Sequence, residues 1–176
     1  LQQDFEGTLT ALARLGCREV EFAGTYGHAA ADVRKILDRL HLTAPSGHCD
    51  IPAVTDQLSE TIATAKALGH RYVVVAWIPD QSRTVLGYTG VADVFNRAGA
   101  ELRKAGLTLG YHNHSFEFEA LEGGPTGYDI LLEHTDPKLV TMELDLFWIR
   151  HAGKDALEYF TRHQGRFSMV HVKDMD

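Results

Sequence analysis

The chain of 176 residues has the length of one domain, and we expect residues 1–176 to fold as a single unit with a substantial hydrophobic core. A formal net charge of −7 argues against a nucleic-acid partner, and no apolar run is long enough to predict a membrane span. The two cysteines, Cys17 and Cys49, lie far apart in the sequence and are expected to be reduced thiols.

The sequence opens at Leu1, inside a helical pattern and without an initiating methionine. We therefore expect it to be one part of a longer protein. No signal peptide is recognisable, which favours a cytoplasmic location.

Hydrophobic periodicity predicts a regular alternation of helices and strands. The segment 72–77 is continuously apolar, which is typical of a strand buried on both faces of a parallel sheet. In chain order we expect a helix over 5–15, a strand over 18–23, a helix over 29–40, a strand over 42–49, a helix over 52–68, a strand over 71–78, a loop over 80–89, a helix over 91–105, a strand over 107–114, a loop over 115–125, a helix over 126–133, a strand over 140–146, a helix over 156–163 and a strand over 167–172.

This alternation predicts right-handed crossovers and a parallel sheet, which is either doubly wound or closed into a barrel. No glycine-rich fingerprint follows the first strand, so a dinucleotide-binding sheet is disfavoured. Functional side chains end many strands, as they do in barrel enzymes. These strand-end residues are Glu21, His48, Trp77, His112, Asp145 and His171. We predict an α/β fold, a (β/α)8 TIM barrel present here as a partial barrel of about six β/α units. Its open edges predict self-association, for example as a homo-oligomer.

Two histidines lie at the end of the predicted strand 107–114. Because side chains alternate along a strand, His112 and His114 are expected to share one face. Two neighbouring imidazoles can hold a metal ion or move a proton. The alternative is a pair of polar residues where a strand enters a loop.

The predicted strand 140–146 carries two acidic residues in an apolar context. Glu143 and Asp145 face the same way, and buried acids need a partner, which would be a metal ion, a lysine or a sugar hydroxyl. A structural salt bridge is the alternative for each. His171 and Lys173 share one face of the last strand by the same rule, although Lys173 also fits an ordinary solvated lysine.

Imidazole and carboxylate side chains together suit a divalent ion, with Mn²⁺ or Mg²⁺ expected first and Zn²⁺ as a further option. Glu21 and His48 are expected to face the same mouth of the predicted barrel, where they would bind substrate hydroxyls or transfer protons. His48 also fits a hydrogen-bonded structural role. Trp77 or Trp148 would give the pocket a flat apolar wall, and Trp148 fits a core position equally well.

The chain resembles the sugar phosphate isomerase/epimerase family, of the xylose isomerase-like TIM-barrel group. The resemblance is carried by Glu19-Val20-Glu21-Phe22, by Tyr111-His112-Asn113-His114 with Phe116-Glu117-Phe118, by Glu143-Leu144-Asp145 with Phe147-Trp148, and by His171-Val172-Lys173-Asp174. It implies that the chain begins in the first helix of the barrel and ends at the seventh strand. It also implies that Asp145 and His171 are metal ligands and that His112 occupies the position of a glutamate ligand. A fourth ligand would lie beyond Asp176.

The resemblance further implies a divalent-metal-dependent sugar isomerase or epimerase, which transfers a proton next to a carbonyl of a sugar or cyclitol substrate. An inosose dehydratase-like enzyme, a lyase or hydratase of 3-keto sugars, and a non-catalytic carbohydrate-binding barrel remain alternatives. The expected roles are metal binding for His112, Asp145 and His171, catalysis for Glu143, His114 and Lys173, and substrate binding for Glu21, His48, Trp77 and Glu117.

Overall fold

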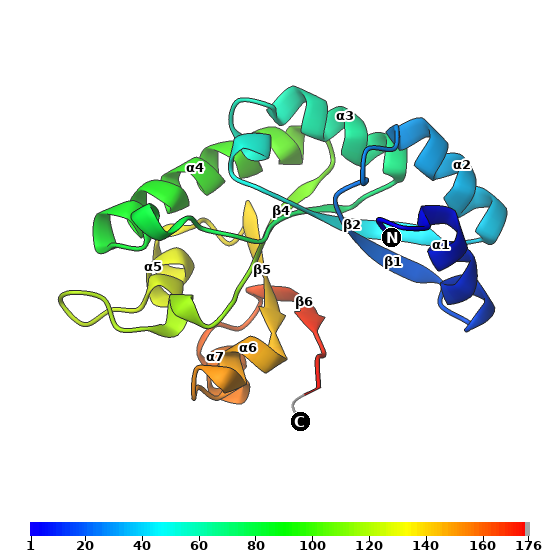
Figure 1. Cartoon of the computed structure of the whole chain (residues 1–176). Helices are drawn as coiled ribbons and strands as arrows, with labels where there is room; N and C mark the ends of the chain where they lie inside the picture. Colours follow the sequence, from blue (N-terminus) through cyan, green and yellow to red (C-terminus); the bar gives the residue numbers. More distant parts are fainter. Residues whose placement is uncertain (175–176) are drawn as a thin grey trace.

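The computed structural model describes residues 1–174 and contains a parallel sheet flanked by helices (Figure 1). The strands are β1 (Glu19–Ala23), β2 (Thr43–Cys49), β3 (Tyr72–Val75), β4 (Thr108–His112), β5 (Val140–Asp145) and β6 (Phe167–His171). The α-helices are α1 (Phe5–Arg14), α2 (Ala30–Leu40), α3 (Leu58–Leu68), α4 (Val85–Lys104), α5 (Gly127–His134), α6 (Leu146–His151) and α7 (Ala156–Arg162). Short 3₁₀ turns are η1 (Pro52–Val54), η2 (Asp80–Ser82) and η3 (Phe116–Phe118).

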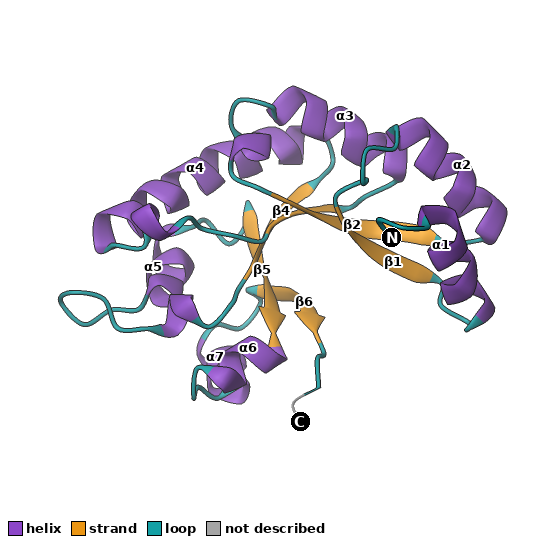
Figure 2. Cartoon of the chain, viewed as in Figure 1, coloured by secondary structure: helices purple, strands orange, loops and turns teal. Residues whose placement is uncertain are grey.

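The strands follow one another in the sheet in the order of the chain, and every neighbouring pair is parallel. The sheet is curved, and α2, α3 and α4 lie along its outer side (Figure 2). Within residues 1–174, β1 and β6 each pair on one side only and form the two edges. The molecule is therefore a half-barrel, which confirms the expected partial (β/α)8 fold.

Side-chain alternation along the central strands separates the core from the inside of the half-barrel. Leu109 and Tyr111 of β4 are fully buried in one cluster with Met142 and Leu144 of β5 and with Phe95 of α4. The residues that alternate with these along each strand, which include His112, Glu143 and Asp145, therefore point to the inside of the half-barrel. The alternation of side chains thus places polar groups on the inner face of two neighbouring strands, at their carboxyl ends.

The interior is closely packed below this end of β4. A Cβ atom added to Gly110 would lie 3.1 Å from Met169 Cε and 3.2 Å from Val74 Cγ2. Such contacts are tighter than ordinary van der Waals packing, so a side chain at this position would force its neighbours apart. The glycine thus lets β3, β4 and β6 close together beneath the mouth.

The prediction of a loop over 80–89 was wrong, because helix α4 begins at Val85 rather than at residue 91. Thr84 caps the helix by accepting a hydrogen bond from Gly87 N at 3.0 Å. Gly87 fits here because an added Cβ would lie 2.3 Å from Ser82 O. Gly87 therefore permits a close approach between turn η2 and the first turn of the helix.

Other boundaries also differ from the prediction. The helix expected over 52–68 is divided, since η1 ends at Val54 and α3 begins at Leu58. Strand β3 ends at Val75 and β4 at His112, so Trp77 and His114 lie in the segments that follow the strands. The short helix α6 was not predicted. No helix in the described part of the chain has both the length and the apolar character needed to cross a membrane.

Candidate metal centre

Five of the six strands deliver ionisable side chains to one end of the half-barrel. Parallel pairing places His112 beside Glu143 and Asp145 beside His171. Because the carboxyl ends of parallel strands meet at the same edge, residues distant in sequence converge there. The side chains that meet are Glu21 of β1, His48 of β2, His112 of β4, Glu143 and Asp145 of β5, and His171 of β6.

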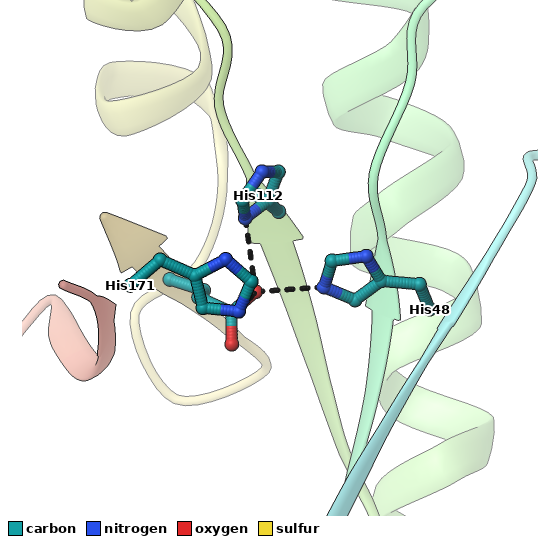
Figure 3. Close-up of side chains that lie close together, drawn as sticks. His48, His112 and His171 are labelled. Carbon is teal, nitrogen blue, oxygen red and sulfur yellow. Dashed lines mark hydrogen bonds and ion pairs between the residues drawn. The ribbon is translucent and has the colours of Figure 1, made fainter. Parts of the chain in front are cut away.

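Glu143 lies at the centre of this group. Its Oε2 atom is 2.9 Å from His48 Nε2, 3.0 Å from His112 Nδ1 and 3.5 Å from His171 Nε2. The three imidazoles point toward one another (Figure 3). One ligand atom from each of His48, His112, Glu143 and His171 lies within 4.8 Å of all the others, so these four residues could hold a metal ion. We call them the inner set.

Glu21 joins the two edges of the sheet. Its Oε2 atom is 2.6 Å from His171 Nε2 and 3.1 Å from His48 Nε2. The contact crosses from β1 to β6, which do not pair with each other. His48, for which the sequence left a structural role open, therefore lies between two carboxylates.

Asp145 approaches two of the same histidines from the opposite side. Its Oδ2 atom is 3.9 Å from His112 Nε2 and 3.7 Å from His171 Nδ1. Its Oδ1 atom accepts a hydrogen bond from Trp148 N at 2.9 Å, which caps helix α6. The backbone N–H of Asp145 donates to Asn113 Oδ1 at 3.0 Å. The carboxylate is thus held in place, with one oxygen facing the two rings. We call His112, Asp145 and His171 the outer set.

Opposing effects set the charge of this centre. Burial raises the pKa of Glu21, but hydrogen bonds with His171 and His48 outweigh it and hold that pKa below its ordinary value. Burial also raises the pKa of Glu143, and hydrogen bonds with His112 and His48 lower it overall. Burial lowers the pKa of His48, but Glu143 and Glu21 raise it to about 9. The hydrogen bond to Glu21 raises the pKa of His171. The carboxylates are therefore ionised, and His48 carries a proton at neutral pH.

The donor set fits a divalent ion. Glu21, Glu143 and Asp145 bring three acidic groups together, and within residues 1–174 their ion-pair partners are imidazoles rather than lysine or arginine. A cation could replace the protons that now balance this charge. Imidazole nitrogens with carboxylate oxygens are common ligands of Mn²⁺ and Zn²⁺.

His114 lies beside the centre and is surrounded by aromatic rings. Its ring stacks on Phe116 at an interplanar angle of 8° and meets the rings of His112 and Trp77 edge-on, both at a centroid distance of 5.2 Å. Burial lowers the pKa of His114 to about 4, and His112 contributes to the shift. Its Nδ1 atom is buried and has no hydrogen-bond partner among the described residues. His114 is therefore neutral and keeps one nitrogen available.

Two other expected site residues lie at the rim. Trp77 is 48% exposed, and the guanidinium of Arg83, which the sequence did not single out, lies 4.7 Å from its ring. Lys173 places Nζ 4.6 Å from the Phe147 ring and 4.7 Å from the Trp148 ring. These contacts suit an apolar wall with a positive charge beside it.

Glu117 lies beneath this rim rather than at it. The residue is fully buried, and its two oxygens accept hydrogen bonds from Tyr111 Oη at 2.5 Å and from His114 N at 2.9 Å. Burial raises its pKa to about 7. These bonds hold the segment that carries His114, so the geometry favours a supporting role over the substrate contact expected from the sequence.

A parallel half-barrel with ionisable side chains at the carboxyl ends of its strands is the architecture of a known enzyme fold. Residues 9–176 match the family model described as xylose isomerase-like TIM barrel, so the chain belongs to this family.

Individual relatives agree with this assignment. The structure of a sugar phosphate isomerase/epimerase from Parabacteroides distasonis aligns with a TM-score of 0.88 and 28% identity, over 98% of this chain and 70% of that chain. An inosose dehydratase from Clostridium perfringens is 22% identical over 198 residues, which are 99% of this chain and 65% of the relative. The chain thus spans 65% of the length of this curated relative. The IOLI protein, solved with a bound zinc atom, shares the fold with a TM-score of 0.73 and 14% identity, over 97% of this chain and 67% of that chain.

Proposed function

We propose that the protein is a divalent-metal-dependent enzyme that acts on a sugar or cyclitol and transfers a proton next to a carbonyl group. The observation that carries the proposal is the approach of His112 Nε2 and His171 Nδ1 to the same oxygen of Asp145, at 3.9 and 3.7 Å. Each of these two separations is short enough for the pair of atoms to share one ion, because each bond to a divalent metal is about 2.0–2.2 Å long.

The outer set, His112, Asp145 and His171, would hold the ion. When bound, a divalent cation supplies Lewis-acid polarisation of a substrate carbonyl and its neighbouring hydroxyl. Two imidazole donors favour Mn²⁺ or Zn²⁺ over Mg²⁺, which prefers oxygen ligands. The zinc atom bound by the structurally similar IOLI protein supports the same expectation.

The proton would be moved by a side chain beside the ion. His114 is neutral and has an unpartnered Nδ1, and its ring contacts that of His112. The neutral ring can therefore act as a base that accepts the proton from the carbon next to the carbonyl and returns it. Lys173, above the rings of Phe147 and Trp148, would stabilise negative charge on a substrate oxygen. The half-exposed ring of Trp77 would stack against the sugar.

Return of the proton to carbon gives an isomerase or epimerase, and loss of a hydroxyl group gives a dehydratase. The first outcome is supported by the 28% identity to a sugar phosphate isomerase/epimerase. The second is favoured by the inosose dehydratase relative, which aligns over 99% of this chain. Both outcomes begin with removal of the same proton, so the residues assigned here serve either reaction.

The test uses the full-length protein, stripped of metal and reloaded with Mn²⁺, Zn²⁺ or Mg²⁺. It is incubated in D2O with a panel of keto sugars and inososes, and the products are followed by NMR. We expect metal-dependent deuterium incorporation next to the carbonyl, with a new isomer or an unsaturated product identifying the reaction. Carbohydrate binding without exchange or product under all three metals would support a non-catalytic barrel and contradict the proposal.

A further inference from the structure

We propose that Glu143 and Glu21 are positioning residues, which fix the ring tautomers of His112 and His171 so that their unprotonated nitrogens face Asp145. This inference rests on the proposed use of the outer set as the metal site. It gives Glu143 a role different from the catalytic one expected from its sequence position, and Glu21 a role different from substrate binding.

The direction of the hydrogen bonds follows from the chemistry of the partners. An ionised carboxylate only accepts hydrogen bonds, so a ring nitrogen bonded to it must carry the hydrogen. His112 Nδ1 is 3.0 Å from Glu143 Oε2, and His171 Nε2 is 2.6 Å from Glu21 Oε2. The hydrogen therefore lies on Nδ1 of His112 and on Nε2 of His171.

A neutral imidazole with one nitrogen protonated has a lone pair on the other. In His112 that atom is Nε2 and in His171 it is Nδ1, and both face Asp145 Oδ2. Their distances to this oxygen, 3.9 and 3.7 Å, are too long for hydrogen bonds. Because Oδ1 of Asp145 accepts a hydrogen bond from Trp148 N, the aspartate presents its other oxygen, Oδ2, to the same space.

His48 connects the two carboxylates. Its Nε2 atom is 2.9 Å from Glu143 Oε2 and 3.1 Å from Glu21 Oε2. One imidazole between two acids offsets their repulsion and holds both at hydrogen-bond distance from the ligand histidines. Glu143, Glu21 and His48 thus form a single network behind the two rings.

The inner set offers a competing arrangement, in which His48, His112, Glu143 and His171 bind the ion directly. With Nδ1 of His112 as its ligand, the atom that lies 3.0 Å from Glu143 Oε2, the inner arrangement would exclude the outer one for a single ion. The outer arrangement is favoured because it keeps the hydrogen bonds at 3.0 and 2.6 Å and uses ring nitrogens that lie too far from Asp145 Oδ2 to hydrogen-bond with it. A carboxylate that orients a ligating histidine from behind is also the usual second partner of such a ligand.

The first test is made on the metal-free, full-length protein labelled with ¹⁵N. Ring-nitrogen chemical shifts should show a hydrogen on Nδ1 of His112 and on Nε2 of His171. Loading with ¹¹³Cd²⁺ should then give metal–nitrogen coupling to Nε2 of His112 and Nδ1 of His171. Coupling to the opposite nitrogens would assign the inner set and overturn the inference.

The second test measures metal affinity by Zn²⁺ titration. Glu143→Gln and Glu21→Gln each remove a charge with little change in shape, and each should weaken binding by about 10- to 100-fold. Glu19→Gln, on the same strand as Glu21 but exposed, is the matched control and should bind normally. Glu21, at the edge of the network, gives the readout if Glu143→Gln does not fold. Wild-type affinity in both cluster variants would contradict the inference.

The two proposals can fail separately. Absence of turnover on every sugar would reject the proposed reaction, but it would leave the tautomers and the coordinating nitrogens as measured. The opposite tautomers in an active enzyme would reject the positioning role alone.

Discussion

Glu21 and His171 lie 2.6 Å apart, although 150 positions separate them in the sequence. They belong to β1 and β6, the two edges of the described sheet. The contact shows that the curvature of the sheet brings its edges within reach at the mouth. Two ion-pair partners of the candidate centre therefore come from strands that form no backbone hydrogen bonds with each other.

Replacement of Asp145 by asparagine should separate a metal ligand from a structural acid. We expect Asp145→Asn to lower turnover of the full-length enzyme by about 10²-fold or more, because under the proposed function the substitution removes a charged metal ligand. Asparagine is also a good N-cap, so the bond to Trp148 N and the melting temperature should be largely kept. Metal content, melting temperature and turnover are measured on one preparation.

The matched control is Asp155→Asn, since Asp155 caps α7 through Leu157 N at 2.9 Å and lies outside the centre. It should leave both metal content and turnover unchanged. Normal turnover and bound metal in Asp145→Asn would remove this residue from the ligand set.

The metal-free protein should lose stability as the pH rises from about 6.5 to about 9. Burial lowers the pKa of His48, but Glu143 and Glu21 raise it from 6.5 to about 9. The folded protein therefore holds this proton more tightly than the unfolded chain. The resulting stabilisation is complete below pH 6.5 and is lost as the pH passes 9, with an upper limit of about 3 kcal/mol.

Thermal melts of metal-free wild type and His48→Gln across this range test the assignment. The variant should show a flatter pH dependence. Metal affinity should change in the opposite sense and rise with pH, because a bound cation competes with the proton. A wild-type melting temperature that climbs between these pH values would be inconsistent with a protonated His48.

A second pH effect is expected at Glu117, in a lower range. Burial raises the pKa of this carboxyl from 4.5 to about 7, so the folded state favours the protonated form. Its contribution to stability is complete below pH 4.5 and is lost as the pH rises through 7, by at most about 3 kcal/mol. The amide of Glu117→Gln cannot ionise. Stability of this variant should therefore lack the loss that Glu117 causes between pH 4.5 and pH 7. Identical pH profiles for wild type and variant would exclude this role.

Packing between α4 and α5 predicts a strong effect at Gly127. A Cβ atom added there would lie 2.1 Å from Cζ of Tyr88, whose ring is fully buried. Gly127→Ala should therefore destabilise the fold by roughly 1–3 kcal/mol or more, as overpacking does. Gly90→Ala is the control, because nothing lies within 4 Å of an added Cβ on this residue of helix α4. The control should be neutral or stabilising by up to about 1 kcal/mol. Chemical denaturation of both variants gives the comparison, and equal effects would show that Tyr88 can move aside.

Side-chain alternation along the strands made much of the geometry of the candidate centre predictable. The alternation that places Glu143 and Asp145 on one face of β5 also places His112 beside them, because neighbouring parallel strands are in register. This alternation does not predict the direction of a side chain beyond the last residue of a strand. His114 follows the end of β4, and its position against His112 depends on the loop that Glu117 holds.

The features that the sequence did not reveal depend on contacts between distant segments. The depth of Glu117 depends on Tyr111, and the start of α4 depends on the space that Gly87 leaves for Ser82. The link between Glu21 and His171 depends on the curvature of the whole sheet. Local periodicity contains no information about such contacts, whereas it determines which face of a strand is apolar.

Asp145 is both the last residue of β5 and the N-cap of α6, so no linker separates this strand from this helix. One of its oxygens faces the histidines, and the other holds the first turn of the helix that carries Trp148. The ring of Trp148 contacts His114, and Lys173 lies above it. One carboxylate therefore contacts both the candidate centre and the helix that forms the wall of its entrance. A substitution at this position would thus change the centre and the start of that helix together.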